Sequence, residues 1–150
     1  MDEASARRIQ AWHYDGPYAL YDIGPSKEAL QAFLDPQNAY HAIDDGAGGL
    51  VAYACFGPDA RVRGGDYEAD ALDVGLGLRP DLTGHGHGLA LVEAILDFAR
   101  GAFAPTAFRL TVAAFNQRAL CVYERAGFQA VQTFAHTGNG KLFVVLVRPA

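Results

Sequence analysis

The sequence predicts one mixed α/β domain, in which helices flank a central sheet. Three observations predict this class. Helical patterns, with apolar residues three or four positions apart, alternate along the chain with strand patterns of period two. No internal repeat, low-complexity tract or linker separates these segments. The length of 150 residues is also ordinary for one domain with its own core. We therefore treat residues 1–150 as a single domain.

The first third of the chain predicts two short helices and a hairpin. Apolar residues at helical spacing in residues 2–12 predict the first helix. Ser26 is a favourable N-cap for the second helix, which ends before Asp35 because the proline after it cannot continue a helix. Two strand-like runs, residues 39–43 and 50–56, flank an Asp-Asp-Gly turn and predict the hairpin.

The rest of the chain predicts four strands and two helices. A strand is expected at residues 72–78, an amphipathic helix at 88–100, a second strand at 108–112 and a second helix at 117–126. A terminal hairpin of two strands is expected at 129–135 and 142–147. Asn116 is the expected N-cap of the second of these helices. Gly127 is expected to end it, because a left-handed residue follows the last turn of many helices.

The composition excludes several classes of partner. The chain has 12 basic and 17 acidic residues, a net charge of −5, and no basic run, so nucleic acid and anionic membranes are unfavourable partners. No stretch reaches the roughly 18 apolar residues of a spanning helix, and the start lacks a signal core. Cys55 and Cys121 lie in apolar segments, which favours a reducing compartment. We therefore expect a cytoplasmic protein.

Glycine is the residue type in excess, and it gathers in one loop between a predicted strand and a predicted helix. This loop reads Thr83-Gly84-His85-Gly86-His87-Gly88. The first turn of a helix leaves N–H groups without partners, and glycines let an anion approach them. The Gly-Lys-Ser/Thr ending of a Walker loop is absent, and no βαβ unit opens the chain. A pyrophosphate site is therefore favoured, with a purely structural turn as the alternative. His85 and His87 lack a third ligand, so no metal is expected.

Two motifs resemble the GCN5-related N-acetyltransferase (GNAT) family. Residues 112–128 contain Asn-x-x-Ala followed by Tyr-Glu-x-x-Gly-Phe, which closely resembles the second half of that family's core. Residues 76–88 resemble its acyl-CoA strand and its pyrophosphate loop, usually Arg/Gln-x-x-Gly-x-Gly. Thr83, His85 and His87 depart from the usual residues, but binding through backbone N–H groups does not depend on them. The resemblance implies a mostly antiparallel sheet. The family's first strand is either absent here or lies upstream of residue 1, since the chain begins with the expected first helix.

The resemblance also implies a function and a site. The function is acetyl-CoA-dependent transfer of an acetyl group to a primary amine of a small molecule or peptide; the alternative is a non-catalytic acyl-CoA-binding module. Tyr123 is implied to donate toward the thiol sulfur, although Asn116 as a cap and Tyr123 as a packed ring remain open from the residues alone. The implied co-substrate contacts are Leu76, Gly77, Leu78, Thr83, Gly84, His85, Gly86, His87, Gly88, Asn116 and Tyr123.

Three further expectations concern the surroundings of this site. The resemblance places the acyl arm against the strand of residues 72–78, and Gly75 and Gly77 leave one of its faces bare enough to admit the arm. The resemblance also implies a bulge at one of these glycines, which would free an N–H group. Asp73 lies on the same face and is the candidate general base, with Glu68 and Asp70 as backups; a merely solvated carboxylate is the alternative.

The resemblance implies that the aromatic segment between the first two helices lies near the acceptor, so this segment is the candidate wall of the acceptor pocket. The expected wall residues of this segment are Tyr14, Tyr18 and Tyr21. The alternative is that these rings are ordinary packing residues. The terminal hairpin supplies a sheet edge through which two copies could pair as a homodimer.

Overall fold

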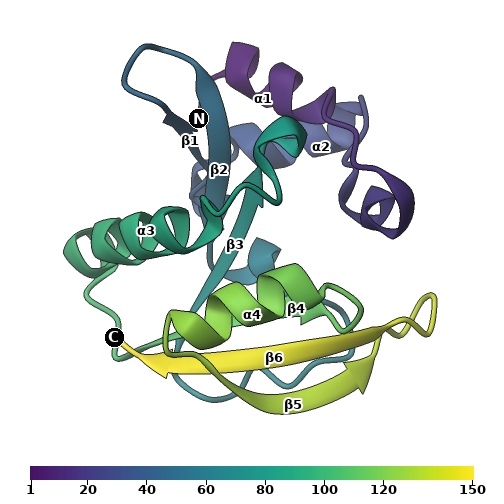
Figure 1. The fold of residues 1–150 in the computed structure, drawn as a ribbon, viewed down its shortest axis with the longest axis vertical. Helices are drawn as coiled ribbons and strands as arrows, with labels where there is room; N and C mark the ends of the chain where they lie inside the picture. Colours follow the sequence, from purple (N-terminus) through teal and green to yellow (C-terminus); the bar gives the residue numbers. More distant parts are fainter.

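Six strands form one sheet in the computed structural model, which describes residues 1–150 (Figure 1). Their order across the sheet is β1-β2-β3-β4-β6-β5. The strands are β1 His41–Asp44, β2 Leu50–Phe56, β3 Leu72–Leu78, β4 Ala107–Ala113, β5 Gln129–Ala135 and β6 Leu142–Pro149. All neighbours are antiparallel except β3 and β4, which run parallel. The predicted mixed, mostly antiparallel sheet is confirmed.

Four α-helices accompany the sheet, and the caps expected from the sequence are present. The helices are α1 Glu3–Gln10, α2 Lys27–Leu34, α3 Gly88–Phe103 and α4 Gln117–Arg125. Ser26 Oγ accepts the N–H of Ala29 at the start of α2, and Asn116 Oδ1 accepts the N–H of Ala119 at the start of α4. Short 3-10 helices include η1 (Gly16–Tyr21) in the aromatic segment and η4 (Pro80–Leu82) after β3.

The main core lies between the sheet and helices α3 and α4. Its fourteen buried residues include Val92, Leu96 and Ala99 of α3, which pack with Phe108 of β4 and Leu146 of β6. A smaller cluster joins α1 and α2 around Ala6, Ile9, Phe33 and Leu50, and Tyr53 of β2 packs against it. Both faces of the sheet are therefore covered near β2 and β3. None of the helices combines the length and the hydrophobicity that a membrane-spanning helix requires.

Candidate active site

Strands β3 and β4 pair only over their first residues and then separate. Their register runs Leu72 with Phe108, Asp73 with Arg109 and Val74 with Leu110, and stops there, although β3 continues to Leu78 and β4 to Ala113. The diverging strands are visible in Figure 1. We call the opening between residues 75–78 and 111–113 the β3–β4 gap.

The backbone of β3 presents alternate residues to this gap. Arg79 N–H donates to Val51 C=O, and Gly57 N–H donates to Asp73 C=O, so the odd-numbered residues of β3 bond to β2. The even-numbered residues point their N–H and C=O groups the other way. Beyond Val74 they have no strand partner, so the N–H groups of Leu76 and Leu78 face the β3–β4 gap. These free donors arise because the strands separate, since the register with β2 contains no bulge. The expected bulge is wrong.

The glycine loop lies between η4 and α3, as predicted. Gly84 and Gly86 have φ values of 80° and 85°, a left-handed conformation that favours glycine. No protein acceptor meets the N–H groups of residues 84–90, because the bonds of this region begin with Leu91 N–H to His87 C=O. Several donors without protein acceptors therefore lie near the positive end of the α3 dipole. The arrangement fits a pyrophosphate. The Thr83 hydroxyl, in contrast, donates to Pro80 C=O at 2.7 Å.

The bare face of β3 is filled by neighbouring side chains of the protein. A Cβ on Gly77 would lie 2.7 Å from Cζ of Tyr53, and a Cβ on Gly75 would lie 2.6 Å from Sγ of Cys55. Both residues lie directly across from these glycines on β2. The expectation that this face admits the acyl arm is therefore wrong. Gly77 also uses its backbone to pair with β2, so it supports the site by making room for Tyr53.

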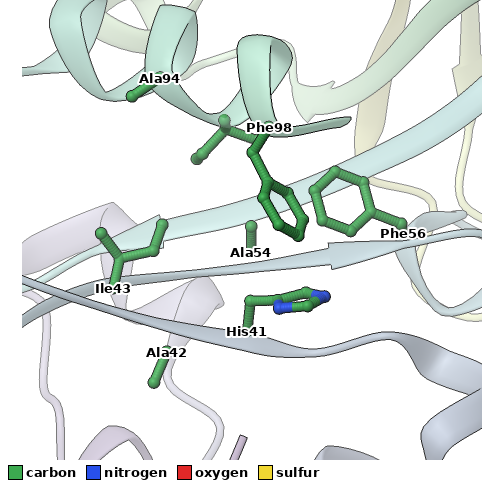
Figure 2. Close-up of a pocket in the computed structure, with 8 residues that line it drawn as sticks. His41, Ala42, Ile43, Ala54, Phe56, Ala94 and Phe98 are labelled. Atoms are coloured by element: carbon green, nitrogen blue, oxygen red, sulfur yellow. The ribbon is translucent and has the colours of Figure 1, made fainter. Parts of the chain in front are cut away.

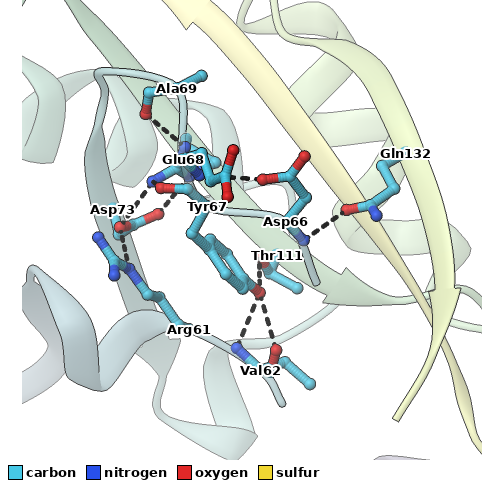
Figure 3. A network of polar contacts seen from close by, with 10 residues as sticks. Arg61, Val62, Asp66, Tyr67, Glu68, Ala69, Asp73, Thr111 and Gln132 are labelled. Carbon is cyan, nitrogen blue, oxygen red and sulfur yellow. Dashed lines mark hydrogen bonds and ion pairs between the residues drawn. The ribbon is translucent and has the colours of Figure 1, made fainter. Parts of the chain in front are cut away.

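Asp73 is an ion-pair residue of the sheet, which contradicts its expected role as general base. Its side chain is 3% exposed. Arg109 donates to both carboxylate oxygens, at 2.5 and 3.0 Å, and Arg61 donates to one of them at 2.6 Å (Figure 3). A carboxylate enclosed by two guanidinium groups is not accessible to an acceptor amine, and its oxygens already accept hydrogen bonds. The backups, Glu68 and Asp70, precede the start of β3, at the opposite end from Leu78.

Tyr123 is buried, with a hydroxyl that makes no hydrogen bond inside the protein. Only 8% of the residue is exposed, yet every fully enclosed polar side-chain atom has a partner, so this hydroxyl reaches accessible space. Burial raises the pKa of Tyr123 well above its usual 10, and Tyr21 contributes to the same shift. Tyr123 in turn contributes to the raised pKa of Tyr53. Burial is the main cause of the shift in both residues, and Tyr123 lies on α4, the helix that follows β4.

Two of the three expected acceptor-wall tyrosines reach the ends of the separating strands. The Tyr14 hydroxyl donates to Leu78 C=O at 2.9 Å, and burial raises the pKa of Tyr14 to about 12. The Tyr21 hydroxyl accepts the Ala113 N–H and an Asn116 Nδ2–H, at 3.3 and 3.1 Å. The side chain of Asn116 therefore both caps α4 and holds Tyr21. Its direct contact with a co-substrate stays a prediction.

Tyr18 lies against two residues of the α4 start. Its ring is 5.6 Å from the ring of Phe115, and the guanidinium carbon of Arg118 lies 4.6 Å from its centroid. Sequence reasoning overlooked Arg118 and Tyr53 as parts of the site. Arg118 stands inside the Asn-x-x-Ala motif, two positions after Asn116, which was the available signal.

Other polar and apolar features lie outside this site. His85 and His87 are exposed, and no group of three or more His, Cys, Asp or Glu side chains is placed to hold a metal ion. An apolar pocket of about 260 Å³ lies between β1, β2 and the middle of α3 (Figure 2). Its lining includes His41, Ile43, Phe56, Ile95 and Phe98. The glycine loop precedes α3, so the two features are separate.

A separated pair of parallel strands, followed by a glycine-rich loop with N–H groups that have no protein acceptor, is the arrangement expected of acyl-CoA acyltransferases. Residues 6–128 match the Acetyltransferase (GNAT) family. The chain therefore belongs to the GNAT acetyltransferase family.

Comparisons with individual proteins agree with this assignment. The chain is 35% identical over 110 residues to the N-alpha-acetyltransferase RimI of Mycobacterium tuberculosis (strain ATCC 25618 / H37Rv), covering 73% of this chain and 64% of that protein. It thus spans less than two thirds of the relative. A spermidine N-acetyltransferase SpeG chimera from Vibrio cholerae and hSSAT has the same fold, with a TM-score of 0.77, 17% identity and coverage of 99% and 92%. The acetyltransferase yncA of Salmonella typhimurium, solved with acetyl-CoA, also has this fold, with a TM-score of 0.67 and 15% identity. The match covers 99% of this chain and 90% of that one.

Proposed function

We propose that this protein transfers the acetyl group of acetyl-CoA to a primary amine of a small molecule or peptide. The observation that carries the proposal is the β3–β4 gap. Its edge offers the free N–H groups of Leu76 and Leu78, the helix that carries Tyr123 follows the strand on its far side, and the glycine loop follows β3 by a few residues. Acetyl-CoA supplies an activated thioester and an anionic pyrophosphate, which match these two sets of donors.

The residues of the chain have distinct roles in this proposal. Backbone N–H groups of the glycine loop bind the pyrophosphate, and those of Leu76 and Leu78 hold the thioester and pantetheine arm against β3. An N–H aimed at the thioester oxygen stabilises the negative charge that develops there when the amine attacks. The Tyr123 hydroxyl donates a hydrogen bond to the departing sulfur. It keeps its proton, because its raised pKa makes it a weaker acid than a thiol.

The proton of the acceptor amine goes to solvent water in this proposal. Asp73 is occupied by two arginines, and the groups described at the gap are backbone amides and phenols. The reaction therefore depends on the fraction of acceptor that is already neutral. Below the pKa of the amine itself, the rate is expected to rise about tenfold per pH unit.

The acceptor is proposed to be a cationic amine, in keeping with the net charge of −5. By their names, the Mycobacterium relative acts on α-amines and the Vibrio enzyme on spermidine. Both acceptor types therefore belong in one panel, with short peptides, spermidine and free amino compounds. Nucleic acid is disfavoured by the same charge.

A Tyr123→Phe variant tests the role of the hydroxyl. Loss of a hydrogen bond to a charged sulfur, roughly 1.5 to 3 kcal/mol, is expected to lower kcat about 10- to 100-fold with little change in the affinity for CoA. Product is measured by mass spectrometry, because the exposed Cys121 would react with a thiol reagent. Tyr67→Phe is the matched control, since Tyr67 bonds to Val62 and Thr111 instead. Unchanged kcat in Tyr123→Phe would remove this residue from the mechanism.

The same assays separate the alternative function. If CoA raises the melting temperature but no amine of the panel is acetylated, the protein is a non-catalytic acyl-CoA-binding module. If CoA causes no stabilisation, neither function holds. Pairing of two copies along β5, and a cytoplasmic location in keeping with two free cysteines, also stay proposals. The oligomeric state in solution tests the first.

A further inference from the structure

Arg118 places an uncommitted guanidinium group beside the glycine loop. Its Nη1 lies 3.9 Å from the position that a Cβ on Gly84 would occupy. The side chain is exposed, and Arg118 takes part in none of the seven ion pairs of the structure. Arg79, the arginine that precedes the loop in sequence, is instead held by both oxygens of Asp81. Arg118 is thus the cation available at the first glycine of the loop.

Tyr18 packs against this guanidinium group. The ring lies 4.6 Å from the guanidinium carbon and packs edge-on against Phe115. Phe115 in turn packs against Tyr21, whose hydroxyl is bonded to Asn116. The ring is therefore part of a connected cluster. Stacking uses the flat face of a guanidinium group and leaves the N–H groups at its edge free to donate.

The loop itself lacks a cationic side chain other than the histidines. The Thr83 hydroxyl is used by Pro80, so the loop contributes backbone dipoles without a fixed charge. A pyrophosphate carries two negative charges, and arginine binds phosphate oxygens with two parallel hydrogen bonds. A guanidinium group at Gly84 therefore supplies the charge that residues 83–88 do not.

Resting on the proposed function, we propose that Arg118 binds the pyrophosphate of acetyl-CoA beside the glycine loop, and that Tyr18 is the positioning residue for its guanidinium group. This assigns Tyr18 to the acetyl donor rather than to the wall of an acceptor pocket. It also connects the two halves of the site, because η1 carries both Tyr18 and Tyr21.

Ligand truncation tests this inference through binding. Dissociation constants are obtained from ligand-induced shifts of the melting temperature with CoA, 3′-dephospho-CoA and pantetheine at millimolar concentrations. Arg118→Ala is expected to weaken CoA and 3′-dephospho-CoA by the same factor, roughly 10- to 100-fold, the loss of a charge-assisted hydrogen bond. Pantetheine, which has no pyrophosphate, is expected to bind both proteins equally. Tyr18→Ala follows the same pattern with a smaller factor, and Tyr18→Phe keeps the wild-type affinities.

A second arginine of α4 provides the control for this experiment. Arg125→Ala removes an arginine from the other end of α4, also outside any ion pair, and is expected to leave all three affinities unchanged. If the Arg118→Ala effect disappears with 3′-dephospho-CoA, the contact is to the 3′-phosphate and the inference is wrong. An equal loss for pantetheine, or no loss for CoA, also overturns it. If the wild-type protein binds none of the ligands, the proposed function fails and the inference falls with it.

Discussion

Replacing Gly77 with alanine would place a methyl group against the edge of the Tyr53 ring. The new Cβ would lie 2.7 Å from Cζ and 3.0 Å from the hydroxyl oxygen, closer than carbon atoms approach without repulsion. The ring cannot move freely, because Trp12, Phe33 and Tyr40 surround it with centroids 6.0, 5.8 and 6.1 Å away. Overpacking of this kind costs roughly 1 to 3 kcal/mol. For a chain of this length the melting temperature is expected to fall by about 2 to 12 °C.

Thermal unfolding of two glycine variants checks this value. Gly101→Ala is the matched control, because Gly101 lies in α3 and a Cβ there meets nothing within 4 Å. This variant is expected to gain roughly 0.5 to 1 kcal/mol from the helix propensity of alanine. In a Tyr53→Ala background the cost of Gly77→Ala should vanish, since the clashing ring is gone. A Gly77→Ala protein that melts like the wild type, but binds CoA less tightly, would refute the reasoning and restore the acyl arm to this face.

Two further predictions concern buried ionisable groups. Asp73→Asn leaves Arg109 buried without its counter-charge, so we expect a loss of roughly 3 to 5 kcal/mol in the free energy of unfolding, measured by urea denaturation; full stability with lost activity would instead support the base role. Burial raises the pKa of five tyrosines above 10, so the unfolded chain releases phenolic protons at lower pH than the folded protein. The free energy of unfolding should therefore be undiminished below about pH 10 and fall as the pH rises further. Absorbance at 295 nm should show these tyrosines ionising only together with unfolding, and free titration in a protein that stays folded would contradict this. The five tyrosines with raised pKa are Tyr14, Tyr21, Tyr40, Tyr53 and Tyr123.

Local patterns predicted the elements closely. The alternation of residues 72–78 and the apolar run of residues 50–56 match β3 and β2 to the residue. A strand can be predicted in this way because its pattern of side chains lies in consecutive residues. Ser26 and Asn116 cap helices as expected, since a cap bonds to an N–H only three residues away. The glycine loop could also be predicted from the sequence, because it lies directly between a predicted strand and a predicted helix.

The surroundings of Asp73 and Gly77 could not be predicted from local sequence patterns. Asp73 was placed on the correct face of its strand, but its partner Arg109 lies 36 residues away on a parallel neighbour. Gly77 left a bare face in the sequence, and only the register of β2 with β3 shows that Tyr53 occupies it. Strand pairing between distant segments decides both.

By itself, then, the sequence determined the order of the elements, the glycine loop and the motifs of the GNAT family, because each depends on residues within one or two turns of one another. Tertiary structure alone decided that β3 and β4 separate after Val74, that a carboxylate is an ion-pair residue instead of a base, and that Arg118 reaches the loop at Gly84. Those features depend on how strands register and how α3 packs beside α4. Such contacts join residues tens of positions apart, and no local pattern encodes them.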